Sequence, residues 1–208
     1  MSRSDRPELT DHWDSVWANS NPESTSWFQP ELSGAVNAIT ARAALSDGVI
    51  DIGGGASGLI DALLNAGFID VSVLDISATA LETARTRLGA LADRVEWIAG
   101  DICGWQPIRE YRLWHDRAVL HFLNDPNEQS AYANNAATAV TPGGTLLVST
   151  FARSGPEQCS GLPVTRHDAT SLANIFRLNF QLLSVTESTH ITPWGSEQRF
   201  TDAEFRRI

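Results

Sequence analysis

The sequence predicts an α/β fold, with a mostly parallel sheet of seven strands and one reversed strand near its edge. From residue 48 onward, short apolar runs alternate with stretches whose apolar residues recur at helical spacing. The glycine-rich stretch "DIGGGASG" (51–58) joins the first run to a helix-like stretch, as at a ligand-binding strand–helix turn. Only "ITPWGS" (191–196) separates the last two strand-like runs, and so short a connection implies an antiparallel hairpin.

The expected strands follow one another along the chain at 48–51, 71–75, 94–101, within 111–123, 145–151, 180–190 and 196–208. Helices are expected at 57–67, 77–91, from 125 onward and near 168–178. The first of these helices closes at Gly67, and the second has Thr79 and Glu82 at the spacing of a capping box, with an apolar face that extends to Leu91. Asp125 caps the third helix, because a proline follows it and a glutamate stands at the third position.

Length and composition narrow the class of protein. A chain of 208 residues suits one domain (1–208), in which a helical or lid segment (1–47) precedes a core (48–208). The net charge is −10 and no basic run occurs, so nucleic acid is not an expected partner. All 15 basic residues are arginine, which excludes a P-loop, Schiff-base or protein-kinase chemistry, since each needs a lysine.

Targeting and metal signals are missing from the sequence. We find no run of 18 apolar residues and no signal peptide, so we expect a cytoplasmic protein without a membrane partner. Two cysteines make neither a disulfide framework nor a zinc cluster, and no metal is expected. The oligomeric state cannot be predicted from these features.

The glycine loop is compatible with more than one cofactor. Gly53, Gly55 and Gly58 form a G-x-G-x-x-G, and Asp75 follows about 20 positions later, as at a dinucleotide site. Asp51, however, stands two residues before the first glycine, where a carboxylate would repel a pyrophosphate and suit an ammonium group. Asp75 could bind the ribose hydroxyls of either NAD or S-adenosylmethionine.

A second carboxylate favours the latter cofactor. Asp101 ends the third strand, where it could meet an adenine amino group at the carboxyl edge of the sheet. In this order, "DIGGG", Asp75, "GDI" (100–102), "WHDRAVLHFL" (114–123) and "TPGGTLLVSTF" (141–151) resemble the motifs of class I S-adenosylmethionine-dependent methyltransferases. The resemblance covers about residues 45–208 and implies a Rossmann-like sheet. Ser57 departs from the pattern, because it stands where the family often has its third glycine.

The resemblance implies a set of site residues. Asp51, Gly53, Gly54 and Gly55 would hold the methionine end of the cofactor, and Asp75 the ribose hydroxyls. Ile76, Asp101 and Ile102 would surround the adenine, and Asp116 and Arg117 would face the methionine moiety and the substrate. Asp116 and His121 are the catalytic candidates, although His121 lies in an apolar run and an orienting or packing role is the alternative.

Aromatic residues dominate the N-terminal segment. Trp13 and Trp17 are four residues apart, on one face of a helix, and Trp27 heads an aromatic–glutamine run. This arrangement resembles thiopurine methyltransferase-like enzymes, in which such a segment closes over the cofactor. The resemblance implies that Trp27 contacts the cofactor in this chain. Static packing against the core is the alternative.

The sequence therefore predicts a methyltransferase that uses S-adenosylmethionine and methylates a small molecule or a protein side chain. One alternative is a regulatory module that binds the cofactor without turnover. Another is an NAD(P)-binding reductase, although its short-chain form would need a Tyr-x-x-x-Lys pair. The acceptor atom is not predicted.

Overall fold

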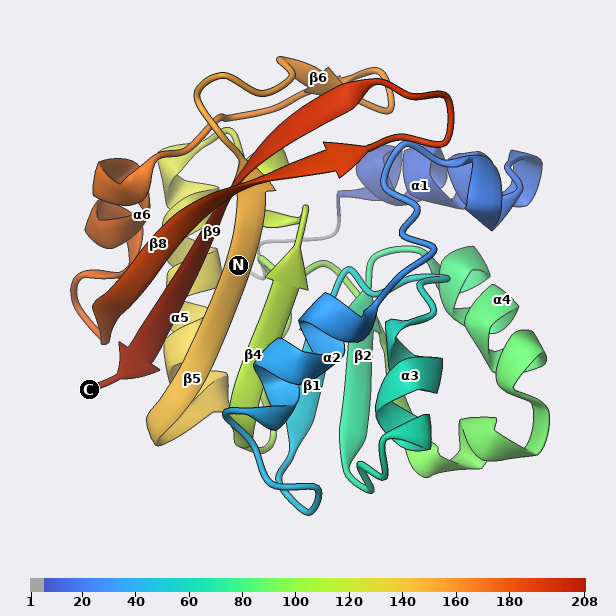
Figure 1. Cartoon of the computed structure of the whole chain (residues 1–208), viewed down its shortest axis with the longest axis horizontal. Helices are drawn as coiled ribbons and strands as arrows, with labels where there is room; N and C mark the ends of the chain where they lie inside the picture. The colour runs from blue at the N-terminus through green and yellow to red at the C-terminus, as the bar shows by residue number, and fades with distance from the viewer. Residues whose placement is uncertain (1–5) are drawn as a thin grey trace.

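A computed structural model describes residues 6–208 and contains the expected seven-stranded sheet, in the order β3-β2-β1-β4-β5-β9-β8 (Figure 1). Strands β1 to β5 are parallel, and β9 is antiparallel to both of its neighbours. The Rossmann-like sheet with one reversed strand next to the edge is thus confirmed. The strands are β1 (Val49–Ile52), β2 (Val71–Asp75), β3 (Val95–Ala99), β4 (Tyr111–Arg117), β5 (Val140–Phe151), β8 (Phe180–Ile191) and β9 (Glu197–Arg207).

Helices cover both faces of this sheet (Figure 1). One core cluster joins α2 (Ser33–Thr40), α3 (Leu59–Asn65) and α4 (Ala78–Leu88) to β1, β2 and β3. The other joins α5 (Pro126–Ala139) and α6 (Ala169–Phe176) to the opposite face. The expected apolar stripe of α3 is buried, and Gly67 closes this helix with φ +100°.

Local signals placed some helix ends correctly and others not. Asp125 caps α5 in a full capping box, as expected. Ser77, not Thr79, caps α4, because its hydroxyl accepts the Ala80 N–H. That helix ends at Leu88, since Gly89 takes a positive φ of +56°; Leu91 lies in the following 3-10 turn η2 (Gly89–Arg94) and is 41% exposed.

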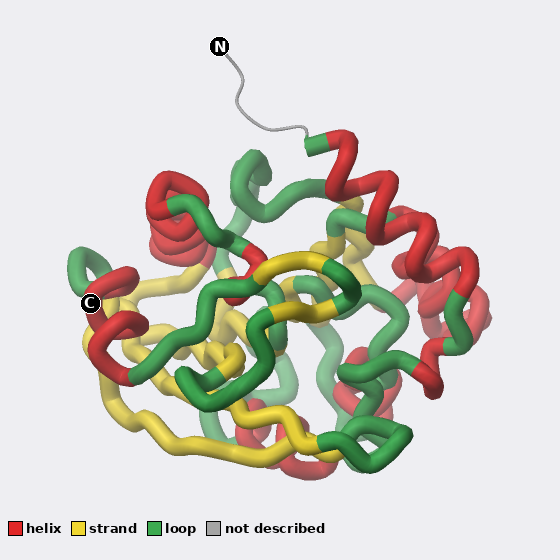
Figure 2. Tube along the Cα trace, turned by 90° about the horizontal axis from the view of Figure 1, so that it is seen from above, coloured by secondary structure: helices red, strands yellow, loops and turns green. Residues whose placement is uncertain are grey.

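Two elements lie at the carboxyl edge of the parallel strands. Helix α1 (Pro7–Asn19) runs across this edge (Figures 1 and 2), and it starts at a proline, which suits a first helical turn. A small hairpin of β6 (Gln158–Cys159) and β7 (Leu162–Pro163) follows β5. The 3-10 turns η1 (Pro22–Ser24) and η3 (Leu120–Phe122) complete this edge. No helix in the described part of the chain has the length and apolar character needed to cross a bilayer.

Candidate active site

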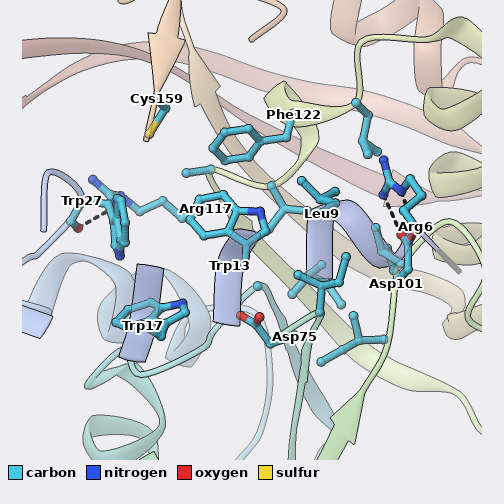
Figure 3. Close-up of a pocket in the computed structure, with 18 of the residues that line it drawn as sticks. Arg6, Leu9, Trp13, Trp17, Trp27, Asp75, Asp101, Arg117, Phe122 and Cys159 are labelled. Atoms are coloured by element: carbon cyan, nitrogen blue, oxygen red, sulfur yellow. Dashed lines mark hydrogen bonds and ion pairs between the residues drawn. The ribbon is translucent and has the colours of Figure 1, made fainter. Parts of the chain in front are cut away.

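Three adjoining cavities open at the carboxyl edge. The edge cavity lies beneath α1, between Trp13, Asp75, Asp101 and Phe122 (Figure 3). The loop cavity lies beside the glycine loop and Asp51, and the strand cavity lies over β5, β8 and β9. Arg117 lines all three.

The glycine loop is shaped by backbone conformations that only glycine adopts easily. Gly53 and Gly55 have φ of +66° and +46°. A Cβ on Gly53 would lie 2.0 Å from the Val119 side chain, and one on Gly54 would lie 2.5 Å from Asp51 Oδ2. Ser57, the departure from the family pattern, accepts the Leu59 N–H at 3.1 Å and so helps to begin α3. The loop backbone therefore lies in close contact with Val119 and with the carboxylates of Asp51 and Asp75, and a larger residue would not fit at these positions.

Asp75 ends β2 and lines the edge cavity. Its Oδ1 accepts the Ser77 N–H at 2.8 Å. Burial raises the pKa of this carboxyl to about 7, with a further contribution from nearby Asp51. The group is thus partly desolvated where hydroxyl donors of a ligand could stabilise its charge.

Asp51 is paired with a residue that sequence reasoning missed. In the parallel register it lies opposite His115 of β4, and Asp51 Oδ1 is 2.7 Å from His115 Nδ1. A carboxylate only accepts, so Nδ1 is the donor in this pair and His115 Nε2 is left without a part in it. His115 lines both the loop and strand cavities.

Asp101 is engaged by the N-terminal segment. Arg6 binds it with two hydrogen bonds, from Nε at 2.5 Å and from Nη2 at 2.6 Å (Figure 3). Arg6 Nη1 also donates to Glu128 at 2.9 Å. Both carboxylate oxygens that we expected to face an adenine amino group therefore contact Arg6. Ile76 and Ile102 line the same cavity, in keeping with an apolar environment for a base.

Asp116 contributes to the lining of the strand cavity, but its carboxylate and the ring of His121 are buried and do not face the cavities as we expected of catalytic groups. Asp116 is fully buried and accepts hydrogen bonds from the Val119 N–H, the Leu120 N–H and the Tyr132 hydroxyl. Burial raises its pKa to about 6. The physical reason is strand alternation: the side chains of His115 and Arg117 point to one face of the sheet, and that of Asp116 points to the other. Its carboxylate stabilises the turn after β4.

His121 is equally enclosed. Its ring is fully buried, stacks on Phe151 with centroids 4.4 Å apart, and accepts the Phe151 N–H at Nδ1. Burial lowers its pKa to about 3, so the imidazole is neutral at working pH. It lies behind the cavity wall, and the geometry supports the packing alternative.

Aromatic side chains from the N-terminal segment fill much of the edge cavity (Figure 3). Trp13 makes edge contacts with Phe122 at 5.1 Å and with Trp27 at 5.8 Å between ring centroids. Trp17 contacts Trp27 in the same way at 5.7 Å. The remaining free volume is about 110 Å³, below the roughly 300–1,000 Å³ typical of ligand pockets. A cofactor would therefore need these rings to move apart.

Comparison with known families indicates which class of cofactor-binding domain this chain resembles. Residues 49–144, which hold the glycine loop, Asp75, Asp101 and β4, match the model of a methyltransferase domain. This part of the chain is therefore similar to a methyltransferase domain. With the sheet order, the match confirms the resemblance to class I S-adenosylmethionine-dependent methyltransferases. The likeness of the N-terminal segment to thiopurine methyltransferase-like enzymes stays a prediction.

Solved structures share the whole fold. A protein studied in the conversion of a disulfide bond into a thioacetal group during echinomycin biosynthesis has a TM-score of 0.74 at 22% identity, covering 95% of this chain and 92% of that one. A methyltransferase from Anabaena variabilis has a TM-score of 0.75 at 14% identity, with 97% and 94% covered. The N-methyltransferase NodS from Bradyrhizobium japonicum has 0.68 at 17%, with 95% and 97% covered. A comparison with curated proteins gave no match.

Two site residues of the methyltransferase domain and its flanking segment escaped the sequence analysis. His115 could have been found, because it and Arg117 are two apart on one strand and share a face. Arg6 gave no signal, since it lies 95 positions from Asp101 in the chain. Residues 6–208 contain no group of three or more histidines, cysteines or acidic residues arranged to hold a metal ion.

Proposed function

We propose that the protein is an S-adenosylmethionine-dependent methyltransferase with a small-molecule acceptor. The observation that carries this proposal is the juxtaposition of Asp51, the closely packed glycine loop and Asp75 in a segment that matches a methyltransferase domain. A protein side chain is a less suitable acceptor, because α1 and the β6–β7 hairpin cover the edge of the sheet.

The residues present fit this cofactor. The backbone of Gly53 and Gly54 would hold the methionine end, with the Asp51 carboxylate toward its ammonium group. Asp75 would accept from the ribose hydroxyls, and Ile76 and Ile102 would pack against the adenine. When bound, S-adenosylmethionine supplies an activated methyl group on a positively charged sulfur that leaves as a neutral thioether.

The chain's own contribution is orientation and exclusion of water. Trp13, Trp17 and Trp27 would enclose the reacting atoms, and aromatic faces beside a cation add about 0.5–2 kcal/mol of attraction. Alignment of acceptor and methyl group can supply roughly 7–11 kcal/mol of the barrier reduction. If the methyl acceptor must lose a proton, Nε2 of His115 is the histidine nitrogen that lies at the loop and strand cavities and could take it.

Relatives in structure lend support to the type of acceptor. NodS is an N-methyltransferase in complex with S-adenosylhomocysteine, and MtfA is a glycopeptide N-methyltransferase complexed with S-adenosylmethionine. An amine acceptor on a small molecule is therefore a reasonable first choice for a screen. A cytoplasmic location also stays a prediction.

Calorimetry and an acceptor screen test the proposal. We expect the purified protein to bind S-adenosylmethionine and S-adenosylhomocysteine and not NADP, because Asp51 opposes a pyrophosphate. Formation of S-adenosylhomocysteine with an amine from a small-molecule panel would identify the reaction. Tighter binding of NADP would overturn the proposal, and cofactor binding without turnover across the panel would favour the regulatory alternative.

A further inference from the structure

Arg117 is the cation at the junction of the three cavities. Its backbone ends β4 beside the glycine loop, but its guanidinium extends to the other side, over the Phe200 ring of β9 at 4.8 Å from the ring centroid. There it shares the edge cavity with Phe151, Cys159 and Gln198. The guanidinium points toward Trp27 and away from Asp75 and Asp101 (Figure 3).

Only one of the two terminal nitrogens of this guanidinium has a hydrogen-bond partner. Nη1 donates to the Trp27 carbonyl at 3.1 Å. Nη2 is buried and has no hydrogen-bond partner in the described part of the chain. Within residues 6–208, no carboxylate lies within ion-pair distance of Arg117 either; nearby Asp202 accepts the Ser149 hydroxyl instead. Burial lowers the pKa of Arg117 to about 10, so it keeps its charge at neutral pH.

A buried, charged donor without a partner is costly, and folded proteins rarely retain one without a reason. The residues that share this cavity do not remove that cost: Phe151 and Phe200 are apolar, the Cys159 thiol is a weak acceptor, and the Gln198 amide makes no hydrogen bond to Nη2. An oxygen atom of a bound ligand would accept a hydrogen bond from Nη2 and remove this cost. A carboxylate is the best match to a guanidinium, because it accepts in the plane of the fork and neutralises the charge.

We propose that Arg117 determines acceptor specificity by binding a carboxylate on a small, otherwise apolar methyl acceptor. This inference rests on the proposed function and deepens it. The carboxylate would approach Nη2 from the edge cavity, and the apolar body of the acceptor would pack between the rings of Trp27, Phe151 and Phe200. The acceptor class is thus an organic acid with a single carboxylate, including amino acids whose amine takes the methyl group.

Two variants and two pairs of ligands test this inference. Arg117→Met removes the charge and keeps the stem, and Arg117→Lys keeps the charge without the fork; Arg85→Met, at an exposed site on α4, is the matched control. The first pair is S-adenosylhomocysteine and 5′-methylthioadenosine, which lacks the amino-acid end. The second pair, titrated into protein saturated with S-adenosylhomocysteine, is benzoate and benzamide.

We expect benzoate to bind the wild type and the Arg85→Met control, and to bind Arg117→Met at least tenfold more weakly. Benzamide and both nucleosides should bind all three proteins alike, and Arg117→Lys should retain part of the benzoate affinity. A thermal melt shows whether each variant is folded. If Arg117→Met is unfolded, the affinities for benzoate and benzamide are compared between the wild type and Arg117→Lys instead.

Three results would overturn the inference. They are an absence of benzoate binding to the wild type, an equal loss of benzoate and benzamide in Arg117→Met, and a selective loss of S-adenosylhomocysteine over 5′-methylthioadenosine. The last would assign Arg117 to the cofactor's own carboxylate. A different result would contradict the proposed function itself: a wild-type protein that binds neither S-adenosylhomocysteine nor 5′-methylthioadenosine.

Discussion

At the residue scale, a side chain that we propose for cofactor binding lowers the stability of the folded chain. Asp75 is held in a buried position where its charge is disfavoured, with a pKa of about 7 instead of 3.8. The folded chain binds this proton more tightly than the unfolded chain. This group's contribution to the unfolding free energy is therefore fully present below about pH 4 and is lost as the pH rises through about 7.

Asp75→Asn separates the two effects. The amide oxygen can still accept the Ser77 N–H, and the buried charge is gone, so the ligand-free variant should be more stable than the wild type at pH 8 by about 1–3 kcal/mol. Cofactor binding should weaken by about 2–4 kcal/mol, because charge-assisted hydrogen bonds to two hydroxyls are lost. Urea unfolding and calorimetry measure both. Unchanged affinity would mean that Asp75 serves only the turn into α4.

Two histidines provide a matched pair for proton transfer. His121→Ala should leave the shape of the pH–rate profile unchanged, because this buried ring, with its pKa near 3, is already neutral across the working range. His115→Gln should lower the rate by about 10²–10⁴-fold and remove an acidic limb, if the acceptor must be deprotonated. The reverse pattern would restore His121 as the base.

Asp116 should prove to be structural. Asp116→Ala leaves two backbone N–H groups and the Tyr132 hydroxyl without their acceptor, so we expect a loss of about 3–5 kcal/mol in unfolding free energy. A stable variant with no turnover would instead support the catalytic role expected from the sequence.

At the element scale, α1 decides access to the site. None of its residues is fully buried, yet Trp13 and Trp17 face the edge cavity, and Arg6 just before the helix binds Asp101. The helix is therefore attached to the core by the Arg6–Asp101 ion pair beside it and by aromatic side chains that are only partly buried. That arrangement is expected of an element that opens and closes.

Deletion of residues 1–30 tests this interpretation. The strand–helix core should still unfold cooperatively, at a lower melting temperature, since apolar surface of the edge cavity becomes exposed. Cofactor affinity should fall and methyl transfer should be lost, because water enters the site. Trp27→Ala should reproduce part of the loss. Intact affinity in the truncated chain would identify the segment as static packing.

At the scale of the whole molecule, the residues proposed for the cofactor and those proposed for the methyl acceptor lie on different halves of the sheet. Strands β1 to β3 carry the residues predicted for the cofactor, β4 stands between, and β5, β9 and β8 form the wall proposed for the acceptor. The two halves share one core cluster, which contains Trp114 of β4 and Phe205 of β9, and Phe205 contacts Phe176 of α6.

Phe205→Ala measures that continuity. Its side chain is 1% exposed, so its truncation should cost about 3–5 kcal/mol in unfolding free energy by leaving a cavity. Ile108→Ala is the control, because Ile108 is 89% exposed and its loss should stay within about 0.5 kcal/mol. Equal effects would contradict a core shared across the sheet.

The sequence by itself determined the order of strands and helices, the glycine loop and the antiparallel hairpin. These features depend on side-chain periodicity and on the special φ angles of glycine, which are local properties of the chain. It also placed Asp51, Asp75 and Asp101 at strand ends, and parallel strands bring such ends to one edge.

Only the tertiary structure decided what each carboxylate contacts. The Asp51–His115 pair depends on the register between β1 and β4, and the Arg6–Asp101 pair on the path of α1 over the edge. Asp116 faces the core and Arg117 the cavities, although they are adjacent in the chain, because neighbouring side chains of a strand point to opposite faces of the sheet. Register and docking are set by packing between segments far apart in the chain, which no local pattern contains.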